Sequence, residues 1–130
     1  MLVYNPNLDG YYYTPKSQRG KGVKNPFRVK LRVLSVEEQA ELQDILITRT
    51  ATEVKSNYGM HFVQSCLRGI VGWENMEDSE GNQIKMSTTV LGRIDTNALN
   101  MIPYQMIEEI GSVITSVSED PKNLAVFADK

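Results

Sequence analysis

The chain has 130 residues, of which 41% are hydrophobic and 23% are charged; these values are typical of one globular domain and exclude wholesale disorder. It contains one cysteine and one histidine, which excludes an internal disulfide and a Cys/His zinc site. No apolar run reaches the roughly 18 residues that a membrane-spanning helix needs, and the first residues do not form a signal peptide, so we expect a cytoplasmic protein.

The net charge of −2 conceals an uneven distribution. Residues 1–34 hold seven basic residues against one acidic residue, which gives +6, whereas residues 35–130 hold seven against 15, which gives −8. Such asymmetry is typical of a basic arm that binds nucleic acid, or of a basic segment that associates with the acidic body of another copy. The charge pattern alone favours neither interpretation strongly.

The first 26 residues are predicted to form a basic arm. Turn-forming residues at 5–10 precede the aromatic run at 11–13, which favours a short strand. Residues 16–26 contain glycine, asparagine and proline but almost no apolar side chain, a composition that is typical of a mobile loop.

The clearest predicted strand follows this loop. Residues 27–33 alternate strictly between apolar and basic side chains, which places all the apolar ones on one face. We expect this strand to pair with residues 11–13 as a hairpin. Because an isolated hairpin is only marginally stable, its apolar face should lie on helices.

Two helices are predicted next. Ser35 and Glu38 match a capping box, which predicts a helix from there to about Ile47. Apolar residues at every fourth position then predict a strongly patterned central helix over residues 54–71, with Gly72 as its C-cap and the following tryptophan covering its end.

The last third of the chain alternates turns and helices in the prediction. Residues 78–82 are typical of an acidic surface turn. Ser87 is expected to cap a brief helix covering residues 90–94, and Pro103 to open a long helix that ends near residue 118.

Together these elements predict a mainly α fold, a small helical domain of about four helices with a short N-terminal β-hairpin. We expect one domain over residues 1–130. Residues 1–26 would be the flexible basic arm and hairpin loop, 27–117 the helical core with its leading strand, and 118–130 a C-terminal tail.

No constellation of residues indicates catalysis. His61 and Cys66 lie five apart on the predicted helix, so they point about 140° apart and cannot form a nucleophile pair. We expect Cys66 to be a core residue and His61 a surface or boundary residue. The glycines at 20–22 do not match a dinucleotide fingerprint or a P-loop, and the turn around Gly81 does not match a calcium loop. We therefore expect no enzyme, no metal and no cofactor.

A family resemblance lies in the second half of the chain. The predicted helix ends in Leu67-Arg-Gly-Ile-Val-Gly-Trp-Glu-Asn-Met, the acidic turn Asp78-Ser-Glu-Gly-Asn follows, and Ser87 leads into two further helices. This arrangement resembles the tail assembly chaperones of long-tailed, siphovirus-type bacteriophages. The resemblance covers roughly residues 27–117, whereas the long basic N-terminal segment departs from many members.

The resemblance implies a non-virion viral protein of the host bacterial cytoplasm. It would bind the tape measure protein and keep its hydrophobic helical segments soluble until tail tube subunits polymerise around it. In many members a programmed frameshift gives a longer product that recruits the major tail tube protein. The alternative is a small nucleic-acid-binding or regulatory domain that uses the basic segment.

Candidate partner contacts come from two segments. The first segment consists of the apolar residues at the end of the central helix. The second is the basic loop, which is also a candidate for self-association. The candidates are Ile70, Val71, Trp73, Lys16, Arg19, Lys21 and Lys24. The acidic body makes nucleic-acid binding the less favoured interpretation of the basic loop.

Overall fold

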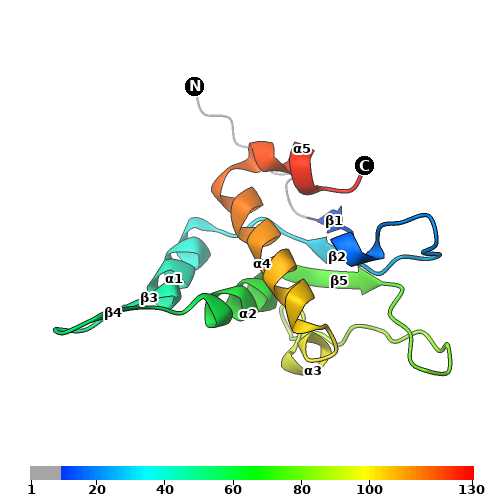
Figure 1. The fold of residues 1–130 in the computed structure, drawn as a ribbon, viewed down its shortest axis with the longest axis horizontal. Helices are drawn as coiled ribbons and strands as arrows, with labels where there is room; N and C mark the ends of the chain where they lie inside the picture. Colours follow the sequence, from blue (N-terminus) through cyan, green and yellow to red (C-terminus); the bar gives the residue numbers. More distant parts are fainter. Residues whose placement is uncertain (1–9) are drawn as a thin grey trace.

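A computed structural model of the chain describes residues 10–130, so the turn expected before Gly10 lies outside the described residues. This part contains five α-helices and two small antiparallel sheets, one of three strands and one of two (Figure 1). Helical residues make up 44% of the described part of the chain, and strand residues make up 18%. The fold is therefore α+β, and the prediction of a mainly α fold is wrong.

The three-stranded sheet joins the N-terminal hairpin to a strand from the middle of the chain. Its order is β1-β2-β5, and both pairings are antiparallel. The pairing of β1 with β2 confirms the predicted hairpin. Val29 and Leu31 on the central strand are fully buried, as the strict alternation predicted. The strands are β1 (Tyr11–Tyr13), β2 (Arg28–Leu31) and β5 (Ile70–Glu74).

The helices vary widely in length. The α-helices are α1 (Val36–Leu46), α2 (Tyr58–Gly69), α3 (Thr96–Leu99), α4 (Tyr104–Glu119) and α5 (Leu124–Phe127). Short 3-10 turns occur at η2 (Lys16–Gln18) and η3 (Pro121–Asn123).

Helix α1 begins with the predicted capping box. The Ser35 hydroxyl accepts a hydrogen bond from the Glu38 amide at 3.2 Å, and the Glu38 carboxylate accepts one from the Ser35 amide at 3.2 Å. The side chains thus satisfy amides that have no partner within the helix. Pro103 likewise directly precedes α4, which confirms the predicted start of the last long helix.

The central helix is shorter than predicted at both ends. Its first predicted turn is instead strand β4 (Val54–Ser56), which pairs with β3 (Ile47–Arg49) in a separate hairpin. At the other end the chain passes from Gly69 directly into β5, so Gly72 is a strand residue and not a C-cap. Pairing with β2 gives Ile70 and Val71 a sheet in which β-branched side chains fit well.

The prediction of a brief helix after Ser87 is also wrong. Residues 88–94 form a tight turn, with a bridge between Thr88 and Ile94 and a left-handed backbone at Gly92 (φ 78°). The helical turn comes later, at α3, where the Asp95 carboxylate accepts a hydrogen bond from the Ala98 amide at 2.8 Å. Asp95 is therefore the capping residue.

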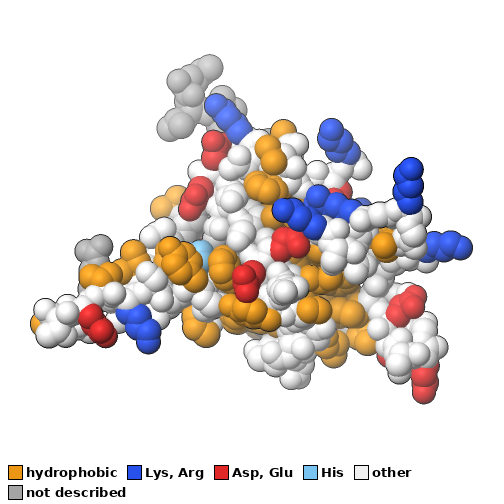
Figure 2. Space-filling view, in the orientation of Figure 1, with side chains coloured by type: hydrophobic (Ala, Val, Ile, Leu, Met, Phe, Trp, Pro, Cys, Tyr) orange, Lys and Arg blue, Asp and Glu red, His pale blue; other side chains and the backbone are white. Residues whose placement is uncertain are grey.

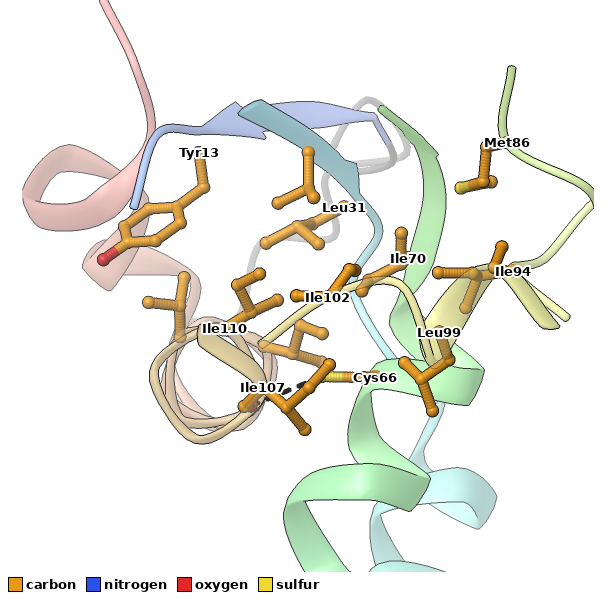
Figure 3. Close-up of a cluster of buried hydrophobic side chains, with 14 of the residues drawn as sticks. Tyr13, Leu31, Cys66, Ile70, Met86, Ile94, Leu99, Ile102, Ile107 and Ile110 are labelled. Atoms are coloured by element: carbon orange, nitrogen blue, oxygen red, sulfur yellow. Dashed lines mark hydrogen bonds between the residues drawn. The ribbon is translucent and has the colours of Figure 1, made fainter. Parts of the chain in front are cut away.

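The core lies between the three-stranded sheet and the α2–α4 pair (Figure 3). Two glycines allow these helices to approach closely. A Cβ at Gly69 would lie 2.7 Å from Cδ1 of Ile114, and one at Gly111 would lie 3.1 Å from the backbone of Phe62. Cys66 is fully buried, as predicted, with Sγ 3.5 Å from the Ile107 carbonyl.

The C-terminal residues pack back onto the molecule near the N-terminal strand (Figure 1). Leu124, Phe127 and Ala128 lie against the core. The Asp129 carboxylate accepts hydrogen bonds from the Thr14 amide at 3.1 Å and from its hydroxyl at 2.7 Å. The predicted tail is therefore fixed to β1.

Candidate protein-binding surface

The apolar residues predicted as partner contacts serve the fold. Ile70 is fully buried, so its assignment to a contact surface is wrong. Trp73 is half-buried: its ring packs edge-on against Phe27, with ring centroids 6.0 Å apart, and Nε1 donates to the Ile84 carbonyl at 2.8 Å. Val71 is half-buried on the same strand. The strand pairing of β5 places these side chains against or beside the core.

The basic loop between β1 and β2 keeps its predicted cations at the surface. Lys16, Lys21 and Lys24 are exposed. Arg19 is also exposed but has internal contacts: its guanidinium lies 5.1 Å from the centroid of the Tyr13 ring, and Nε donates to the Thr14 carbonyl at 2.8 Å. Among the described residues these four cations form no hydrogen bond or cation–π contact with Ile70, Val71 or Trp73, although Trp73 packs against Phe27 directly after the loop.

The basic face of β2 is largely neutralised within the protein. Arg28 pairs with Glu74 at 2.7 Å, and its guanidinium stacks 4.1 Å from the centroid of the Tyr12 ring. Arg32 pairs with Glu38. Burial alone would raise the pKa of Glu38, but hydrogen bonds from the Ser35 amide and from Arg32 outweigh it and hold that pKa below its usual range. These arginines are therefore structural.

The β3–β4 hairpin is the most exposed element of the fold. It projects from the body between α1 and α2 (Figure 1), and every residue of β4 is exposed. Figure 2 shows hydrophobic side chains along this hairpin and its base, whereas basic side chains gather at the opposite end of the same face. Val54, Tyr58 and Met60 are each more than half exposed in this region. Because contiguous exposed hydrophobic surface marks interaction sites, this region is a candidate contact surface.

A groove lies between α1 and α4, with one residue of α2 in its lining. Its volume is about 280 Å³. On the α1 side its walls are Val36, Gln39, Ala40, Leu42 and Gln43. Leu42 is 2% exposed and Val36 is 81% exposed, so the groove has an apolar base and an apolar outer edge. We call this the α1–α4 groove.

The rest of the α1–α4 groove comes from α2 and α4. His61, Thr115 and Glu119 complete its lining. His61 is 9% exposed, which corrects the prediction of a surface or boundary residue, and its Nδ1 has no hydrogen-bond partner among residues 10–130. Burial lowers the pKa of His61, while the Glu119 carboxylate acts in the opposite direction. The imidazole is therefore favoured in its neutral form.

Sequence reasoning missed this groove. Leu42 and Ile45 belong to the buried face of α1, which the apolar pattern indicates. Val36 and Ala40, four residues apart, form a second apolar pair on another face of the helix. This second apolar pair was the only sign of the groove in the sequence of α1. It is a weak sign, because the neighbouring positions Gln39 and Gln43 are polar.

The titratable groups of the core do not form a reactive centre. Burial raises the pKa of the Cys66 thiol, so the thiol stays protonated, and thiolate is the nucleophilic form. Within residues 10–130 no group of three or more His, Cys, Asp or Glu side chains could hold a metal ion. No helix in the same range is long and apolar enough to cross a bilayer.

Comparisons with protein-family models, curated proteins and solved structures found no match to this chain. Its function must therefore be inferred from its own residues and surface.

Proposed function

We propose that this chain is a non-catalytic protein-binding chaperone, and that it acts as a phage tail assembly chaperone. Its client would be the tape measure protein, whose hydrophobic helical segments it would keep soluble in the host bacterial cytoplasm until the tail tube polymerises. It would leave before the virion is complete. A longer, frameshifted product would recruit the major tail tube protein.

The observation that carries this proposal is the α1–α4 groove with the exposed hydrophobic side chains beside it. A chaperone for amphipathic helices needs an apolar groove of a kind that receives side chains spaced three and four residues apart. Leu42 supplies an apolar base, and Val36 an exposed apolar edge. Val54, Tyr58 and Met60 are further exposed hydrophobic side chains, on β4 and α2.

The internal pairing of the arginines makes nucleic acid the weaker alternative. Binding to phosphates requires cations that are free to replace counterions. Arg28 and Arg32 are instead paired with carboxylates, and Arg19 contacts Tyr13. The exposed lysines of the basic loop are too few to define a phosphate-binding track and are separated from the groove.

Co-expression with the tape measure protein of the same genome tests the proposal. We expect the tape measure protein to be insoluble alone, to become soluble with this chain, and to co-purify with it in a tagged pull-down. An unrelated soluble protein of similar size and net charge is the control. A tape measure protein that stays insoluble and unbound would reject the chaperone proposal, and retention of the chain on nucleic acid would restore the alternative.

A further inference from the structure

The α1–α4 groove has one carboxylate in its lining, that of Glu119, and the other acidic residues of α1 and α4 lie outside the lining. The helices that form its two walls carry seven acidic residues and no Lys or Arg. These acidic residues are Glu37, Glu38, Glu41 and Asp44 on α1, and Glu108, Glu109 and Glu119 on α4.

Only part of this negative charge is neutralised within the protein. The Glu38 carboxylate pairs with Arg32, and its Oε2 also lies 3.5 Å from Nη1 of Arg93. Oε2 of Glu41 lies 3.0 Å from Nη2 of Arg68. Glu119 is different, because it is exposed and lines the groove itself, and no ion pair forms there within residues 10–130. It also stands at the C-terminal end of α4, where the helix dipole is negative.

The groove also leaves one polar group unsatisfied. His61 is nine-tenths buried, and its Nδ1 has no hydrogen-bond partner among the described residues. Buried polar atoms in native proteins nearly always have a partner, so this unpaired imidazole nitrogen is an unusual feature of the wall of the groove.

The size of the groove favours a protein side chain as its occupant. At about 280 Å³ it lies just below the usual range of small-molecule pockets, about 300–1,000 Å³. Its lining is apolar at the base, where Leu42 lies, and includes one exposed carboxylate, that of Glu119. One or two apolar side chains followed by a cation would satisfy both features.

We propose, on the basis of the chaperone function proposed above, that the α1–α4 groove binds an amphipathic helix whose apolar stripe is flanked by Lys or Arg. Apolar anchors of this helix enter the groove over Leu42 and beside Ala40. A basic side chain on its flank pairs with Glu119. The Glu119 carboxylate disfavours a helix that brings Asp or Glu to the same place, so the groove prefers basic segments of the client.

Two synthetic peptides provide the direct test. Both carry leucine at positions i, i+3, i+4 and i+7, and their flanking residues are all lysine in one and all glutamate in the other. Titrated into the ¹⁵N-labelled full chain, the lysine peptide should shift the amide signals of Ala40, His61 and Thr115. The glutamate peptide should not. Equal binding of both peptides, or shifts confined to the basic loop or the hairpin, would overturn the proposal.

Ala40→Arg blocks the groove with a bulky cation without removing a core contact, because Ala40 is exposed. We expect the lysine peptide to bind at least about tenfold more weakly, since like charges at an interface are strongly unfavourable. The matched control is Ala125→Arg, which places the same side chain at an exposed position of α5. Equal affinities of the two variants would argue against the groove.

Glu119→Lys tests the contact between Glu119 and the peptide without disturbing the fold. A cation at the C-terminal end of α4 suits the helix dipole better than a carboxylate, so folding should be preserved. The lysine peptide should bind about fivefold more weakly, the scale of one exposed ion pair, and the glutamate peptide should bind more tightly. An unchanged preference between the two peptides would show that Glu119 does not select the charge.

The same variants in the tape measure co-expression distinguish two failures. If the wild-type chain solubilises the client and Ala40→Arg does so equally well, the groove assignment is wrong and the chaperone function stands. If the wild type fails there but binds the lysine peptide in the groove, the tape measure assignment is wrong and the groove stands. Peptide competition with a concentration-dependent dimer would identify a second copy as the occupant and overturn the proposal.

Discussion

The two sheets of this protein are built from similar residues but have opposite environments. In β2 the inward-facing Val29 and Leu31 are fully buried, and the sheet they belong to is covered by α4 on that side. In the β3–β4 hairpin, Val54 is 67% exposed and the strands contact little beyond each other. β-branched residues therefore favour a strand in both places, and only long-range packing decides whether that strand is buried.

The difference has a functional meaning. The three-stranded sheet satisfies its side chains within the chain, through the core on one face and through Arg28 paired with Glu74 on the other. The hairpin side leaves hydrophobic side chains and the α1–α4 groove open. We infer that the sheet maintains the fold and that the hairpin side binds the partner.

The largest expected effect on stability comes from Leu31→Ala. Leu31 is fully buried on the central strand, so truncation removes apolar contacts and leaves a cavity that costs about 2–5 kcal/mol. Leu91→Ala is the control, because Leu91 is 72% exposed and its loss should change stability by less than about 0.5 kcal/mol. Urea unfolding monitored by Trp73 fluorescence measures both. Equal losses would contradict the assignment of β2 to the core.

A matched pair of Val→Thr substitutions compares the two sheets directly. Val29→Thr puts a hydroxyl into the core without a hydrogen-bond partner, which should lower the free energy of unfolding by about 1–3 kcal/mol. Val54→Thr makes the same change on the exposed hairpin and should stay within about 0.5 kcal/mol of wild type. Thermal unfolding of the two variants gives the comparison. A costly Val54→Thr would mean that the hairpin is packed against a second molecule in solution.

The local signals in the sequence predicted much of the fold. The alternation at residues 27–33 gave β2 and its buried face, and the Ser35/Glu38 pair gave the start of α1. The central helix was misjudged because Val54 and Ile70 continue its four-residue spacing. In the structure both residues lie in strands. The spacing of apolar residues does not report hydrogen bonding to another strand, so it could not reveal this.

The candidate site was much less predictable than the fold. Ile70 and Trp73 stood out because they are apolar and lie at the end of the predicted central helix, but their pairing with β2 directs them to the core. The α1–α4 groove joins residues that lie up to 83 positions apart, from Val36 to Glu119. A surface assembled from three helices has no continuous motif, so composition and spacing could not locate it.

Ser35→Ala tests the capping box at the start of the helix that links the two regions. Loss of the hydroxyl leaves the Glu38 amide without its partner and should cost about 1 kcal/mol. Ser35→Asp, which keeps an acceptor at the N-cap, should restore most of that stability. Ser112→Ala is the control, since this hydroxyl bonds only within α4. Chemical unfolding measures all three, and no loss in Ser35→Ala would show that the cap is not needed.

The smallest expected effect is the pH dependence contributed by His61, the only histidine of the chain. Burial lowers its pKa in the folded state, whereas the unfolded chain keeps the ordinary value of 6.5. As the pH falls below 6.5, the unfolded state binds a proton that the folded state does not, so the free energy of unfolding falls. The loss ends once the pH is below the folded pKa.

Comparison with His61→Phe isolates this effect. The variant lacks the titrating ring but keeps an aromatic side chain in the wall of the α1–α4 groove. Urea unfolding between about pH 7.5 and 5 should show a steeper loss of stability in the wild type, by no more than about 1.4 kcal/mol per pH unit, the limit for one proton. Parallel curves would show that His61 titrates alike in both states. A steeper wild-type curve would show that the folded protein keeps the His61 imidazole neutral in the wall of the α1–α4 groove, so that Glu119 has no cation beside it from this ring.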